Sequence, residues 1–124
     1  MEHQLFQEVK TDFKKLAKNN EIQAILLFGS TVTGDRTARS DVDVCIVVPT
    51  AQDRVEILRS AWRHIGGKYD LWLFEELPLY IQAEVIQHHQ VLHRSDLPAL
   101  FEYFYPFRKL ISDMKYRQRM AMKD

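Results

Sequence analysis

The chain has 124 residues, 46% of them hydrophobic, which suits one domain with a buried core and leaves too little for a second. Its 17 basic side chains balance 17 acidic ones, so net charge predicts no direct nucleic-acid partner, and the single Cys45 excludes an intramolecular disulfide. No apolar run approaches the roughly 18 residues of a membrane helix, and the opening MEHQLFQEVK is too polar for a signal peptide. We therefore expect a cytoplasmic protein.

Hydrophobic periodicity predicts a helix and two strands in the first part of the chain. Apolar residues at helical spacing begin at Phe6, and this amphipathic helix is expected to end near Asn19. The nearly continuous apolar run 22–28 is typical of a strand buried on both faces. The alternating pattern over 41–48 predicts a second strand, which Pro49 ends.

The second part of the chain predicts further helices and strands. Asp53 and Glu56 resemble a capping box ahead of a helix that ends near Ile65. The remaining expected elements are a strand over 69–74, a helix from Pro78 to Gln87, a brief edge strand over 90–93, a helical segment opened by Asp96 and Pro98, and an amphipathic helix over 107–124. This order predicts one α/β or α+β domain over residues 1–124.

Charge is distributed unevenly towards the C-terminal end. Residues 68–102 carry two basic and six acidic side chains, whereas residues 108–124 carry six basic and two acidic ones. The helix over 107–124 is therefore a candidate surface for partner contact, and the alternative is that it only covers the sheet.

Three aspartates are the candidate catalytic and metal-binding residues. Asp41 and Asp43 alternate along a strand, so they face the same way with Cα atoms about 7 Å apart. Asp70 lies on the same face, close to Asp41 and Asp43, if its strand is the neighbour of theirs in the sheet. Close carboxylates repel and raise one another's pKa, and divalent ions such as Mg²⁺ relieve that repulsion. The alternative is that Asp41 caps a turn and Asp43 pairs with Arg36 or Arg39.

The turn before the second strand is suited to binding a phosphate group. Gly29 has no side chain, so a ligand can approach its backbone closely, and Ser30 can cap a helix or donate to a phosphate oxygen. A helix that begins here offers free N–H groups to an anion.

These residues together resemble the signature of a known superfamily. Gly29 and Ser30, ten intervening residues and then Asp41-Val42-Asp43 resemble the GS-x10-DxD motif of polymerase-β-like nucleotidyltransferases. Gly34 and Ser40 match its minimal members, the MNT partners of HEPN toxins in toxin–antitoxin pairs. The resemblance implies a small mixed sheet flanked by helices.

The same resemblance implies a mechanism and a partner. ATP binds through Gly29, Ser30 and Ser40, while Asp41 and Asp43 hold two Mg²⁺ ions that Asp70 helps to coordinate. Asp70 also helps to deprotonate the acceptor, and AMP passes to a hydroxyl, in this family a tyrosine of a HEPN toxin, so that the protein acts as an antitoxin. The oligomeric state stays open, and a homo- or hetero-oligomer is possible.

Two other functions remain as alternatives. One is a binding module that neutralises its partner by contact alone, which a degenerate motif would favour. The other is a nucleotidyltransferase for small molecules of the aminoglycoside type. Such enzymes usually carry an additional helical domain, for which 124 residues leave little room.

Overall fold

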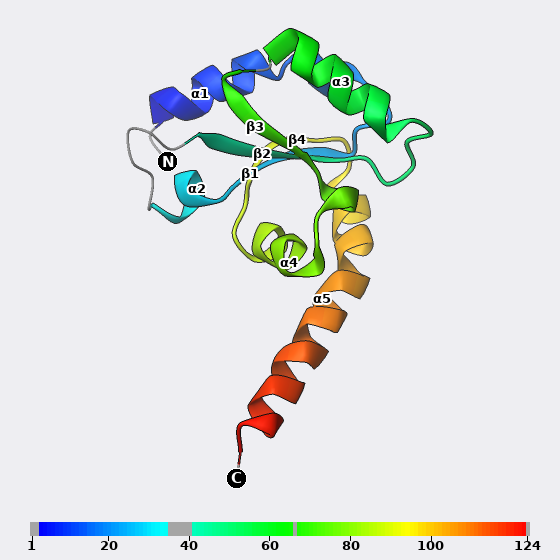
Figure 1. The fold of residues 1–124 in the computed structure, drawn as a ribbon. Helices are drawn as coiled ribbons and strands as arrows, with labels where there is room; N and C mark the ends of the chain where they lie inside the picture. Colours follow the sequence, from blue (N-terminus) through cyan, green and yellow to red (C-terminus); the bar gives the residue numbers. More distant parts are fainter. Residues whose placement is uncertain (1–2, 35–40, 66, 124) are drawn as a thin grey trace.

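The computed structural model describes residues 3–34, 41–65 and 67–123. Helices and strands alternate along most of the chain (Figure 1). In order they are α1 (His3–Asp12), the 3-10 helix η1 (Leu16–Lys18), β1 (Ala24–Phe28), α2 (Ser30–Thr33), β2 (Val42–Val47), α3 (Arg54–Ile65), β3 (Tyr69–Leu73), the 3-10 helix η2 (Phe74–Glu76), α4 (Leu79–Gln87), β4 (Gln90–Arg94) and α5 (Leu97–Ala121).

The strands form one four-stranded mixed sheet in the order β3-β2-β1-β4. β1 is antiparallel to both β2 and β4, and β2 is parallel to β3. Parallel neighbours require a crossover, which α3 supplies between β2 and β3. The predicted mixed sheet flanked by helices is confirmed, and the brief strand β4 lies at the edge, as expected.

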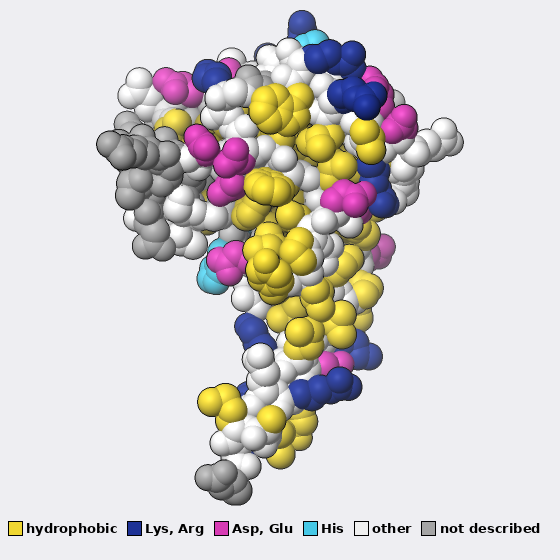
Figure 2. All heavy atoms as spheres, in the orientation of Figure 1, with side chains coloured by type: hydrophobic (Ala, Val, Ile, Leu, Met, Phe, Trp, Pro, Cys, Tyr) yellow, Lys and Arg dark blue, Asp and Glu magenta, His cyan; other side chains and the backbone are white. Residues whose placement is uncertain are grey.

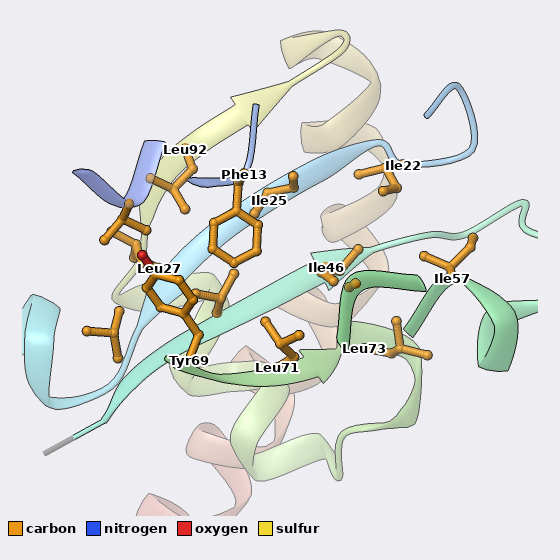
Figure 3. Close-up of a cluster of buried hydrophobic side chains, with 14 of the residues drawn as sticks. Phe13, Ile22, Ile25, Leu27, Ile46, Ile57, Tyr69, Leu71, Leu73 and Leu92 are labelled. Carbon is orange, nitrogen blue, oxygen red and sulfur yellow. The ribbon is translucent and has the colours of Figure 1, made fainter. Parts of the chain in front are cut away.

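Helices cover both faces of the sheet, which explains why every residue of β1 is buried. α1 and α3 lie over one face, α4 and α5 over the other (Figure 1). The core under α1 and α3 joins Phe13 to Tyr69, whose ring centroids are 5.1 Å apart, and includes Ile46 and Leu71 (Figure 3). The second core gathers residues of β1 and β2 with residues of α4 and α5, including Cys45.

Local signals set several of the observed boundaries. The N–H of Glu56 donates to Oδ1 of Asp53 at 3.0 Å, so the predicted cap opens α3. The expectation that the first helix runs to about Asn19 is wrong, because α1 ends at Asp12 and the chain continues through a turn into η1. Helix ends often tighten in this way, and periodicity alone does not distinguish the two forms.

α5 differs from the expectation of a separate helix over 107–124. It is continuous from Leu97 to Ala121, with Pro106 inside it and an Asp96 cap whose Oδ1 accepts from the N–H of Ala99 at 3.3 Å. Pro106 removes one backbone donor, and the burial of Phe104 and Ile111 on either side of it stabilises the uninterrupted helix. The second half of α5 extends away from the sheet (Figure 1). In the described ranges, no helix combines the length and hydrophobicity needed to cross a membrane.

Candidate active site

Asp43 and Asp70 lie side by side on the face of the sheet that α4 and α5 partly cover. The register of the parallel pair β2–β3 sets Asp43 opposite Asp70, and the antiparallel pair β1–β2 sets Asp43 opposite Phe28. Residues opposite one another in a sheet point to the same side. The prediction that the strand of Asp70 neighbours that of Asp43 is therefore confirmed, and Asp41, one residue before β2, lies close enough for its charge to act on Asp43.

Asp43 is held between the turn at Gly29 and the indole of Trp72. Nε1–H of Trp72 donates to Oδ1 of Asp43 at 3.2 Å. The other oxygen, Oδ2, lies so close to the backbone of Gly29 that an added Cβ would be 2.6 Å from it. Gly29 also has φ +79° and ψ −154°, a conformation that side chains other than glycine rarely adopt. We expected a ligand to approach the backbone of Gly29 closely. In this structure the carboxylate of Asp43 lies against that backbone.

Burial raises the pKa of the Asp43 carboxyl, because desolvation disfavours its charged form. The hydrogen bond from Trp72 acts in the opposite direction, and the negative charges of Asp70 and Asp41 add to the rise. The expected repulsion between the carboxylates is therefore present, and its effect on the pKa of Asp43 is smaller than that of burial. A cation at Asp43 would favour the ionised carboxylate and so oppose this shift.

The turn leads into a short helix, as we expected for a turn that binds phosphate. α2 begins at Ser30 after Gly29, and the N–H groups of Val32 and Thr33 donate to the carbonyl oxygen of Gly29, each at 3.1 Å. Gly34 closes the helix in the left-handed conformation with φ +88°. The first N–H groups of such a turn have no partner within the helix and point outward.

The three aspartates have the right chemistry for Mg²⁺, which prefers oxygen ligands from a few carboxylates together with water and phosphate. In the described part of the chain, however, no group of three or more His, Cys, Asp or Glu side chains converges closely enough to hold a metal ion. Asp41 and Asp70 are exposed, so they can rotate towards a cation beside Asp43. The assignment of all three as metal ligands stays a prediction.

Some predicted site residues lie outside the described ranges. Ser40 is one of them, and Arg36 and Arg39, the alternative partners of Asp43, lie there as well. In contrast, Trp72 contacts Asp43 and was not predicted from the sequence. The sequence contained a pattern that could have identified Trp72. It follows Asp70 by two residues on one strand and therefore points to the same face of the sheet.

Acidic side chains gather near the start of β2 and β3, beside hydrophobic side chains over α4 and the upper part of α5 (Figure 2). A mixed sheet that carries such an acidic group beside a glycine turn is the arrangement of a nucleotidyltransferase. The family model described as "Polymerase beta, Nucleotidyltransferase" matches residues 12–97, which is more than half of the chain. The protein belongs to this nucleotidyltransferase family.

Two relatives come from Methanocaldococcus jannaschii. "Putative protein adenylyltransferase MJ1547" is 43% identical over 100 residues, covering 81% of this chain and 78% of that protein. "Putative protein adenylyltransferase MJ0141" is 35% identical over 71 residues, covering 55% of this chain and 70% of that protein. The first match extends over most of both chains, so the two share more than the motif.

Two solved structures share the fold. A chain from "Crystal structure of the toxin-antitoxin with AMP-PNP" has a TM-score of 0.61 at 18% identity and covers 92% of this chain and 98% of its own. A chain from a structure described as "tri-AMPylated Shewanella oneidensis HEPN toxin in complex with MNT antitoxin" has a TM-score of 0.57 at 15% identity, covering 95% and 99%. At these identities the likeness is one of fold.

Proposed function

We propose that the protein transfers AMP from ATP to a hydroxyl group of a partner protein, namely a tyrosine of a HEPN toxin, and thereby acts as its antitoxin. The observation that carries this proposal is the register that sets Asp43 beside Asp70, next to the turn at Gly29. The names of the two archaeal relatives and the assemblies in the two similar structures support the substrate class.

In this mechanism Asp41, Asp43 and Asp70 would hold two Mg²⁺ ions. The metal would neutralise charge on the phosphates and on the attacking and leaving oxygens. The turn at Gly29 and Ser30 binds the triphosphate, with its β- and γ-phosphates over the start of α2. Trp72 keeps Oδ1 of Asp43 in place.

The proposed transfer is a single in-line displacement. The acceptor oxygen forms a bond to the α-phosphorus while the bond from that phosphorus to its bridging oxygen breaks. Pyrophosphate leaves with the electron pair, and the hydroxyl proton passes to the carboxylate of Asp70. Most of the acceleration then comes from positioning and charge neutralisation.

Mass analysis of the partner after the reaction tests this function. The chain is incubated with the protein encoded by the neighbouring gene, Mg²⁺ and ATP, and the partner is analysed by mass spectrometry. We expect the partner to be a HEPN protein that gains AMP on a tyrosine, with loss of its toxicity. An unmodified partner that is nevertheless neutralised would favour the alternative, a module that acts by contact alone.

The second half of α5 is the proposed surface for partner contact. Exposed hydrophobic side chains alternate there with basic ones: Met114, Tyr116 and Met120 with Lys115, Arg117 and Arg119. Aromatic, Met and Arg side chains are enriched in protein interfaces. Figure 2 shows this mixture of hydrophobic and basic side chains on the part of α5 that extends from the body.

Deleting residues 114–124 is expected to weaken partner binding about tenfold or more, while ATP binding stays within about twofold. The deletion begins after Ile111, which is buried and belongs to the core. Val55→Ala serves as the control, because Val55 is an exposed hydrophobic residue of α3 on the other side of the sheet. Calorimetry with each ligand measures both affinities. An unchanged affinity for the partner would mean that the second half of α5 does not contribute to partner binding.

A further inference from the structure

A pocket of about 320 Å³ opens beside Asp43, between β3 and the start of α4. Apart from Asp43, its lining is aromatic or aliphatic: Phe28, Trp72, Leu77, Pro78, Tyr80 and Ile81. Trp72 and Tyr80 are 43% and 73% exposed, which is unusual for large aromatic side chains. The pocket thus combines apolar walls with one carboxylate, as ligand sites commonly do.

The sheet order decides which part of the reaction this pocket can serve. β2, with Asp43, lies between β1, which leads into the turn at Gly29, and β3, which carries Asp70 and Trp72. In the proposed function the pyrophosphate leaves from the β1 side, over Gly29. An in-line displacement requires the attacking oxygen to approach from the opposite side of the phosphorus, which is the β3 side. Trp72 lies on that side, and the pocket extends from Trp72 past Asp43 to Phe28 of β1.

We propose that this pocket binds the aromatic ring of the acceptor residue and so selects tyrosine over serine or threonine. The inference rests on the proposed function and deepens it. The ring packs against Trp72 and Tyr80 in a tilted or offset arrangement, while its hydroxyl group reaches the carboxylates of Asp43 and Asp70. A serine or threonine side chain is too short to cover these apolar walls and place its hydroxyl group at the same point.

The two tryptophans of the chain provide a direct binding test. In a ¹⁵N-labelled sample their indole N–H groups give two NMR signals, which the Trp62→Phe variant assigns. Trp62 is 52% exposed on α3, which covers the other face of the sheet, so it is an internal control. The probes are N-acetyl-L-tyrosinamide, N-acetyl-L-serinamide and adenosine, each titrated into the full chain with Mg²⁺.

We expect the tyrosinamide probe to shift the Trp72 signal saturably and to leave the Trp62 signal in place, while the serinamide probe shifts neither. Adenosine that shifts the Trp72 signal and displaces the tyrosinamide would make the pocket a nucleobase site and overturn the inference. A Trp72 signal that does not respond to the tyrosinamide would overturn it as well.

Transfer from ATP to N-acetyl-L-tyrosinamide provides the second readout. Tyr80→Ala is expected to raise the KM for this acceptor about tenfold and to leave the Kd for ATP within about twofold. The matched control is Tyr105→Ala, since Tyr105 is also exposed, at 66%, and lies on α5 outside the pocket. An unchanged KM in Tyr80→Ala would overturn the inference. Selective binding of the tyrosinamide without any transfer would count against the proposed function and leave the pocket assignment standing.

Discussion

Asp43→Asn is expected to reduce AMP transfer by about 1000-fold or more and, at the same time, to make the fold more stable at neutral pH. Asparagine cannot supply the negative charge that a metal ion requires at this position. It can still accept the hydrogen bond from Nε1–H of Trp72, which fixes the side chain in the present structure. The variant also removes a partly buried negative charge, whose desolvation opposes folding.

The sign of the stability change follows from the pKa of Asp43, which is higher in the folded protein than in the unfolded chain. The native state then binds the proton more tightly, so this group stabilises the fold at low pH. That contribution is lost as pH rises from about 3.9, the ordinary aspartate value, through the raised pKa. Above this window the wild type is less stable than Asp43→Asn.

Thermal unfolding at neutral pH and below pH 4 measures this difference. We expect a Tm about 1–3 °C higher for Asp43→Asn at neutral pH, and a smaller difference in acid, where the wild-type carboxyl is protonated. Asp41→Asn is the control, because Asp41 is exposed and its replacement should reduce transfer without this gain. A lower Tm for Asp43→Asn at neutral pH would show that the charge of Asp43 stabilises the fold.

Gly29→Ala is expected to destabilise the protein by about 3 kcal/mol and to stop transfer. The new Cβ would lie 2.6 Å from Oδ2 of Asp43, so the carboxylate must move. The positive φ of Gly29 adds backbone strain of about 1–3 kcal/mol. Gly67→Ala is the matched control, because Gly67 has φ +93° and, apart from its neighbours in the chain, no atom of the described residues within 4 Å of the added Cβ.

Urea unfolding and transfer assays on Gly29→Ala and Gly67→Ala distinguish the effect of backbone strain from the effect of moving the Asp43 carboxylate. Gly67→Ala should lose about 1 kcal/mol through its backbone and remain active at temperatures where it is folded. Gly29→Ala should lose more stability and also lose activity while folded. Equal losses in the two variants, with activity retained, would mean that the contact between Gly29 and Asp43 is unimportant.

The sequence predicted the neighbourhood of the site because short-range patterns determine it. Alternation along a strand sets the face of Asp43 and of Asp70, and the apolar runs around them identify strands that must pair to be buried. The close contact between Gly29 and Asp43 was not predicted, since it depends on the register of β1 against β2. Register is a property of two segments and their turn together.

Tertiary packing accounts for the other differences. The hydrogen bond from Trp72 depends on the direction of its indole, and the pocket depends on where α4 packs, so neither follows from one segment alone. Pro106 ordinarily interrupts a helix, and local preference predicted a break there. Burial of Phe104 and Ile111 against the sheet outweighs that preference.

AMP transfer is tested most directly with ATP labelled at one phosphate at a time. The chain, Mg²⁺ and the partner protein are incubated with ATP carrying the label at the α- or the γ-phosphate, and the partner is separated and counted. We predict that label passes from the α-phosphate and none from the γ-phosphate, and that the double variant Asp41→Ala with Asp43→Ala transfers neither while it remains folded. Transfer of the γ-label, or full transfer of the α-label by the double variant, would contradict the assignment of these aspartates to AMP transfer.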